Sequence, residues 1–265
     1  MMRPALMQLY ASDYALWGLA TFLELILCIL VVRRGLYRRL PFFSVYLALA
    51  FASGILVWWA YHFLNYGSWA AWYFSRTVQG VILVARGLVI VELCRVSLRA
   101  YRGIWALAWR LLCAIALLLL VSAAINAREH ADHIASFVRA GERGLELAAA
   151  VVLLSLFLIS RYYQIRIEHA PRVIAFGLCF YSLIQVLNNS FMAEWLAHYV
   201  PWWNGIRLAS FQVALVIWIV ALWRPLPAAA PAPALLPQEV YNELAPQMNY
   251  RLRVLNQRLL EILRP

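Results

Sequence analysis

Seven apolar runs separated by short polar links constrain this chain more than any other feature of its sequence. The runs cover residues 14–32, 42–63, 72–96, 107–125, 145–160, 173–196 and 206–223. A helix needs about 20 mainly apolar residues to cross the hydrocarbon core of a bilayer. Because lipid offers no partners for backbone polar groups, such runs must satisfy their own N–H and C=O groups as helices. We therefore predict an all-α fold, a polytopic membrane protein built as a bundle of seven transmembrane helices.

Composition supports this class of protein and excludes others. Hydrophobic residues make up 65% of the chain and charged residues 13%, whereas soluble domains are about 45–50% apolar and about 25% charged. The formal charge of +11 arises from arginine alone, since the sequence has no lysine. In a membrane protein such an excess belongs to the loops, so the expected partner is the lipid bilayer and not nucleic acid. Covalently bound retinal needs a lysine amine and is excluded, and no other cofactor is expected.

The arginines are divided unequally between the two ends of the predicted bundle. Twelve lie near one set of alternate loops and six near the other, the six being Arg3, Arg76, Arg128, Arg139, Arg143 and Arg207. Cytoplasmic loops carry the excess of positive residues. This distribution predicts an N-terminus outside and a C-terminus in the cytoplasm, and we interpret the membrane as the inner (plasma) membrane of a bacterium.

One charged residue lies near the middle of an apolar run. Arg86 interrupts the run 72–96, and a charge at that depth costs roughly 2.5–3.5 kcal/mol on insertion scales, so it needs a partner. Glu24 lies nine residues before Arg33, as Arg86 lies nine before Arg95, which places both about 13 Å from the basic boundary. We predict a buried Glu24–Arg86 pair. Glu92, nearer the boundary, is expected to be served by Arg95, Arg99 or water.

Further polar residues suggest a cavity that opens outward. Arg76, Gln79 and Arg86 share one stripe of the third predicted helix, and the candidate cavity comprises Arg76, Gln79, Arg86, Gln185, Asn188 and Gln212. Its arginines would suit an anionic group, although such amides also form hydrogen bonds between helices without a ligand. The first and fifth runs each contain a glutamate and end at an arginine, Glu24 with Arg33 and Glu146 with Arg161, a faint repeat of the kind found in small transporters. The alternative function is therefore a small solute transporter with an arginine-lined cavity between spans 1, 3, 6 and 7.

The C-terminal part of the chain differs from the bundle. We predict three regions: a seven-span bundle over 1–224, a Pro/Ala-rich linker over 225–238 and a cytoplasmic amphipathic tail over 239–265. Prolines in the linker favour an extended spacer. In the tail, apolar residues follow one another at spacings of 4, 3, 4 and 3, as in a coiled-coil seam: Met248, Leu252, Leu255, Leu259 and Ile262. So short a helix needs a partner surface, which could be a second copy, a cytoplasmic protein or the membrane.

Catalytic and metal-binding motifs are nearly missing from the sequence. His130 and His133, in the segment EHADH, form a weak candidate metal site, because two histidines and two carboxylates are possible ligands but lack the zinc-protease pattern. No nucleophile elbow, Walker loop or dinucleotide fingerprint is present. We therefore expect a non-enzymatic membrane component, sensory or scaffolding, with a cytoplasmic interaction helix.

Overall fold

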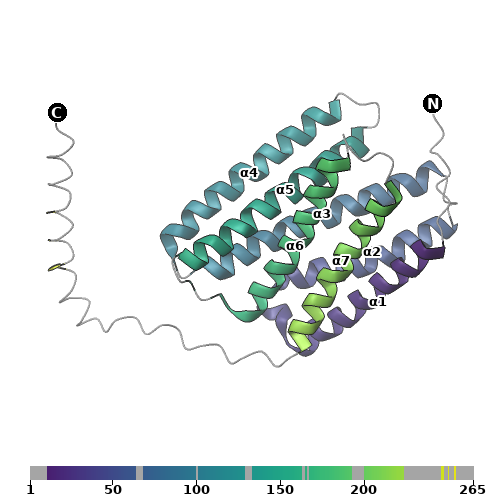
Figure 1. Cartoon of the computed structure of the whole chain (residues 1–265). Coiled ribbons are helices and arrows are strands. Elements are labelled where there is room, and N and C mark those ends of the chain that lie inside the picture. The colour runs from purple at the N-terminus through teal and green to yellow at the C-terminus, as the bar shows by residue number, and fades with distance from the viewer. Residues whose placement is uncertain are drawn as a thin grey trace. The chain divides into compact units, whose positions relative to one another are not determined.

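The computed structural model describes residues 11–63, 68–99, 101–128, 133–162, 165, 167–192 and 200–223, together with four residues of the tail, 246, 247, 250 and 254. These residues form helices and short connections, and no strand occurs among them. The helices are α1 (Ala11–Arg33), η1 (Leu36–Arg38), α2 (Pro41–Phe63), α3 (Trp69–Leu98), α4 (Arg102–Arg128), α5 (His133–Tyr162), α6 (His169–Met192) and α7 (Val200–Trp223) (Figure 1). The predicted all-α class is confirmed.

Five of the helices are long and apolar enough to cross a membrane, namely α1, α2, α4, α5 and α6. Helices α3 and α7 are not among the five. The apolar stretch of α3 carries Arg86, Glu92 and Arg95. In α7 the apolar stretch whose side chains are described is shorter, from Leu208 to Trp223. Long apolar helices of this kind are typical of a helical membrane protein. The coarse prediction, a membrane-embedded bundle of helices, therefore agrees with the structure.

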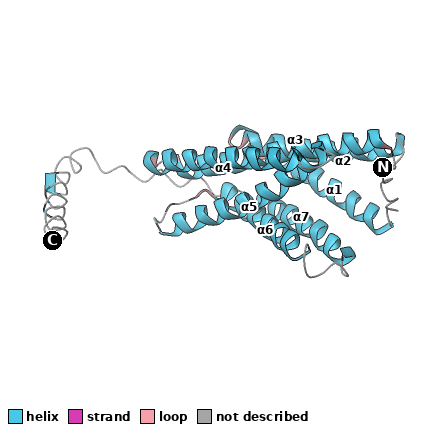
Figure 2. Cartoon of the chain, turned by 90° about the horizontal axis from the view of Figure 1, so that it is seen from above, coloured by secondary structure: helices cyan, strands magenta, loops and turns pink. Residues whose placement is uncertain are grey.

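The helices lie in two layers. Figure 2 shows α2, α3 and α4 along one layer and α1, α5, α6 and α7 along the other. Neighbouring helices pack in the cyclic order α1, α2, α3, α5, α6, α7 and back to α1. The core at their centre contains Leu27, Phe43, Leu93, Leu153 and Trp218, all fully buried. Six helices thus enclose the core, which positions side chains of α2, α3, α5 and α6 to meet inside it.

Helix α4 lies at the edge of this arrangement. It packs mainly against α5 and less closely against α3. None of the residues in the most apolar stretch of α4 is buried. In the most apolar stretch of α6, more than half of the residues are buried. In a membrane protein such an exposed apolar helix faces lipid, so α4 adds little to the core.

Two helices extend into segments that the sequence predicted to be links. The expected link 126–144 is largely helical, because α4 continues to Arg128 and α5 begins at His133. The expected turn around residues 198–205 also belongs in large part to α7, which begins at Val200. Pro201 fits there because a proline in the first turn of a helix removes no helical hydrogen bond. Hydropathy marks where apolar residues occur and not where a helix begins.

The loop between α1 and α2 is tied to the end of α7. Gly35 has φ of 64°, the left-handed conformation that glycine adopts at low cost after a helix. Arg34 donates a hydrogen bond of 2.6 Å to the carbonyl oxygen of Trp223, the last residue of α7. A cation at a helix C-terminus also complements the helix dipole. This contact fixes the point at which the chain leaves the bundle.

The chain divides into two compact units, Met1–Leu226 and Pro227–Pro265. The first contains the seven long helices named above, which are those of the described residues. The predicted seam of the tail, formed by Met248, Leu252, Leu255, Leu259 and Ile262, lies outside the described residues, so its helix and its pairing stay predictions.

Candidate functional site

The centre of the bundle holds an ion pair between two helices. The guanidinium Nη1 of Arg86 on α3 donates to Oε1 of Glu146 on α5, and Ser182 Oγ of α6 donates to the second carboxylate oxygen, Oε2, at 2.6 Å. Arg86 is 8% exposed, Glu146 1% and Ser182 0%. Both oxygens of the carboxylate therefore have donors within the protein. We call Arg86, Glu146 and Ser182, with the two tyrosines described next, the buried charge cluster.

Two tyrosines complete the surroundings of Arg86. Its guanidinium carbon lies 4.9 Å from the ring centroid of Tyr181 on α6, within the range of a cation–π interaction. Tyr46 of α2, which is almost fully buried, also interacts with Arg86. The Nε atom of Arg86 has no hydrogen-bond partner in the described part of the chain. Side chains from α2, α5 and α6 therefore converge on one cation, Arg86, which α3 supplies.

The predicted Glu24–Arg86 pair is corrected by this geometry, because the carboxylate that binds Arg86 belongs to Glu146. Two reasons explain the difference. Helix α1 packs against α2 and α7, whereas α3 packs against α2, α4, α5 and α6. The predicted fifth run also began at residue 145, which placed Glu146 at a helix end, whereas α5 begins at His133 and carries Glu146 near its middle. Two residues at the same number of positions from the basic ends of their helices lie at similar depth, but this does not show that their helices are neighbours.

Glu24 is buried away from this pair. It is 6% exposed and makes no hydrogen bond or ion pair with a residue that the structure describes. Cys28 on its own helix and Tyr46 on α2 are close enough to interact with it electrostatically. Tyr46, a member of the buried charge cluster, therefore interacts electrostatically with both Glu24 and Arg86.

The residues of the predicted cavity are distributed over several places. Arg76 and Gln79 are brought together, with Arg76 Nη1 donating to Gln79 Oε1 at 2.8 Å on the exposed side of α3. Gln212 instead donates to the carbonyl of Leu16 on α1, at 2.9 Å. Gln185 and Asn188 are buried on α6, and Asn188 Oδ1 is among the buried atoms without a partner. The hydrogen bonds just described do not join these five residues to Arg86, which donates to Glu146 instead.

Glu92 has a role that the sequence did not reveal. Its carboxylate accepts the backbone N–H of Phe42 at 3.0 Å and of Phe43 at 2.8 Å, in the first turn of α2. These N–H groups have no partners within their own helix, and a negative charge at a helix N-terminus is stabilising. The partner of Glu92 is thus the first turn of α2 and not the expected Arg95, Arg99 or water. The sequence signal that could have indicated this helix end is Pro41, the first residue of α2.

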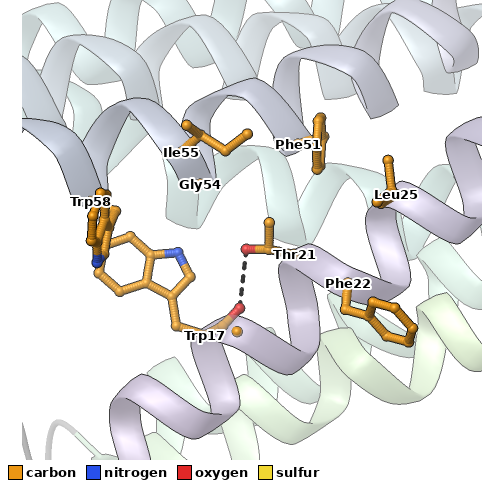
Figure 3. Close-up of a pocket in the computed structure, with 9 residues that line it drawn as sticks. Trp17, Thr21, Phe22, Leu25, Phe51, Gly54, Ile55 and Trp58 are labelled. Atoms are coloured by element: carbon orange, nitrogen blue, oxygen red, sulfur yellow. Dashed lines mark hydrogen bonds between the residues drawn. The ribbon is translucent and has the colours of Figure 1, made fainter.

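An open groove between α1 and α2 is a second feature that sequence reasoning missed. It has a volume of about 560 Å³ and is lined by five residues of α1 and four of α2: Trp17, Gly18, Thr21, Phe22, Leu25, Phe51, Gly54, Ile55 and Trp58 (Figure 3). None of the six predicted cavity residues lines it. No charged side chain lines it either.

The remaining candidate residues give no site in the described part of the chain. His130 and the side chain of His133 lie outside it, and the described residues contain no cluster of three metal-ligating side chains. Cys28, Cys94, Cys113 and Cys179 are free thiols.

Comparisons with protein-family models, curated proteins and solved structures find no significant match.

Proposed function

We propose that the protein is a non-enzymatic, sensory or scaffolding component of a membrane, in which a stable helical bundle presents a cytoplasmic interaction helix. The observation that carries the proposal is the buried charge cluster. Both oxygens of Glu146 have protein donors, and neither Glu146 nor Arg86 is open to solvent. Such a pair orients helices. The charges at mid-bundle then hold the platform together and are not available to a solute.

Seven spans with the N-terminus outside belong to this proposal. The shortest of the seven long helices has 23 residues, about 34 Å at 1.5 Å per residue, which suffices for a hydrocarbon core of about 30 Å. The arginine distribution supports a cytoplasmic C-terminus. Single cysteines at Tyr37→Cys and Ala131→Cys, in a background without the four native cysteines, test it. A membrane-impermeant maleimide should label the second from outside intact cells and the first only after lysis; the reverse pattern would contradict the orientation.

Partner binding through the tail is the functional half of the proposal. We expect Leu252→Asp combined with Leu259→Asp to remove chemical cross-links between the tail and its cytoplasmic partner or a second copy, because the seam would carry two charges. Val254→Asp combined with Gln257→Asp is the matched control off the seam and should retain them. Deletion of 226–265 should also remove the cross-links while the bundle stays folded. Unchanged cross-links in the Leu252→Asp/Leu259→Asp variant would overturn the proposal.

A small solute transporter is the second candidate, and one observation favours it. Gln185 and Asn188 lie buried three residues apart on α6, and the Asn188 carbonyl oxygen lacks a partner among the described residues, as expected of a group that binds a solute. Proteoliposomes should then take up a polar or anionic solute, and Asn188→Leu should abolish uptake. Equal uptake with and without Asn188, or none across a solute panel, would count against this candidate.

A further inference from the structure

Two glycines, Gly18 on α1 and Gly54 on α2, explain the groove between these helices. A Cβ atom built on Gly54 would lie 3.1 Å from Thr21 Oγ1, so a glycine there lets the two helices approach closely. A Cβ atom on Gly18 would meet nothing within 4 Å. Gly18 therefore leaves open space beside the contact that Gly54 permits, and the groove remains unfilled by the protein's own side chains.

The groove runs from one end of the helices toward their middle. Trp17 lies 16 residues before the end of α1 at Arg33, and Trp58 lies 17 residues after the start of α2 at Pro41, so both are about 25 Å from the loop that joins the helices. Leu25 and Phe51 lie closer to that loop, at about 12–15 Å. In helices that cross a bilayer, tryptophans at such a level mark the headgroup interface, and the groove extends from there into the hydrocarbon region.

The walls face outward and are apolar. Phe22 is 58% exposed and Trp58 is 50% exposed, and α1 and α2 are both among the helices that can cross a membrane. The exposed walls therefore meet lipid. An occupant must be apolar along most of its length, because the lining contains no ionisable side chain.

Polar groups occur at the tryptophan end only. Thr21 Oγ1 donates to the carbonyl of Trp17 at 3.1 Å, and in Figure 3 the indole nitrogen of Trp17 is turned toward Thr21 and the α2 wall. Among the described residues the indole N–H of Trp17 has no hydrogen-bond acceptor, although an indole N–H shielded from water usually finds one. The groove thus offers a donor at the interface and an apolar channel below it.

We propose that this groove binds one acyl chain of a membrane phospholipid, with the ester carbonyl of that chain accepting the N–H of Trp17. A phospholipid places an acceptor at the interface and an apolar tail beneath it, which is the order of groups in the groove. The bilayer supplies this ligand at high concentration. Because the lining carries no charge, it does not select for a particular headgroup. The residues that line this site do not belong to the buried charge cluster.

Photolabelling in nanodiscs tests the proposal with a phosphatidylcholine that carries a diazirine near the middle of one acyl chain. We expect the label on Leu25 and Phe51 to exceed that on Leu117 and Leu118, which are more exposed on α4. Gly18→Leu fills the groove without a backbone clash and should lower labelling of Leu25 about fivefold or more, a change of about 1 kcal/mol in occupancy. Gly103→Leu, another helical glycine with nothing within 4 Å of its Cβ position, should leave it unchanged.

Trp17→Phe tests the contribution of the hydrogen bond without filling the groove. It keeps an aromatic ring and removes the donor, and should lower labelling about threefold, the effect of one modest hydrogen bond. Equal labelling of the groove and of α4, or the same labelling in wild type, Gly18→Leu and Trp17→Phe, would overturn the proposal. Protein–protein cross-links at Leu25 or Phe51 would do so as well, because a second copy would then occupy the groove.

Discussion

Glu146 and Glu24 are both glutamates buried in the same bundle, yet they have different surroundings. Glu146 lies between Arg86 and Ser182, and both of its carboxylate oxygens accept hydrogen bonds. Glu24 is nearly as buried but has neither an ion pair nor a hydrogen bond among the described residues. The difference shows that burial alone does not identify the partner of an intramembrane charge, which depends on which helices are neighbours.

The largest expected effect comes from breaking the pair on the acidic side. Glu146→Gln leaves the guanidinium of Arg86 buried without a counter-charge, which costs about 3–5 kcal/mol of unfolding free energy. Unfolding of the purified protein in mixed micelles, followed by circular dichroism, measures it. Retention of wild-type stability would show that Glu146 is not the principal partner of Arg86.

A smaller effect is expected at the start of α2. Glu92→Gln keeps one acceptor oxygen for the N–H groups of Phe42 and Phe43 but removes the charge that favours them, and loss of a charged acceptor of this kind costs about 1–2 kcal/mol. The same unfolding assay checks the loss. Hydrogen exchange should also become faster in the first turn of α2 and stay unchanged at the start of α3, where Ser68 caps the helix. Equal exchange in α2 of both proteins would contradict a capping role.

Ser182→Ala should cost less. It removes one neutral donor to Glu146 while the ion pair persists, and such interhelical hydrogen bonds in membranes average about 0.6 kcal/mol with a maximum near 1.7. Ser160→Ala removes a buried hydroxyl that has no partner within the described ranges; it is the matched control and should be neutral or slightly stabilising. Equal losses from the two substitutions would argue against a specific role for Ser182.

The smallest effect is expected at Glu24. Glu24→Gln removes a carboxylate that has no partner among the described residues, so the free energy of unfolding of the protein should change by less than about 1 kcal/mol. The comparison with Glu146→Gln uses the same substitution at a similar degree of burial. A loss as large as that of Glu146→Gln would mean that Glu24 has a partner essential to the fold.

The sequence allowed the helical class and the positions of the apolar runs to be predicted, because hydropathy reports what a bilayer requires. It also identified Arg86 as a buried cation in need of a carboxylate. The partner was missed because the polar segment before Glu146 was interpreted as a link, although it forms the first turns of α5. Contacts such as Glu92 with Phe43, 49 residues apart, depend on helix packing and leave no local pattern. The groove likewise depends on where Gly18 and Gly54 meet across two helices.

A double-mutant cycle on the unfolding free energy tests the central claim that Arg86 and Glu146 form one unit. Arg86→Leu and Glu146→Leu should each destabilise strongly, whereas the double variant should recover most of the loss, because replacing a whole buried ion pair by apolar residues is often neutral. The corresponding cycle with Glu24→Leu should be additive within about 0.5 kcal/mol. Additivity between Arg86 and Glu146, or strong coupling between Arg86 and Glu24, would contradict this account.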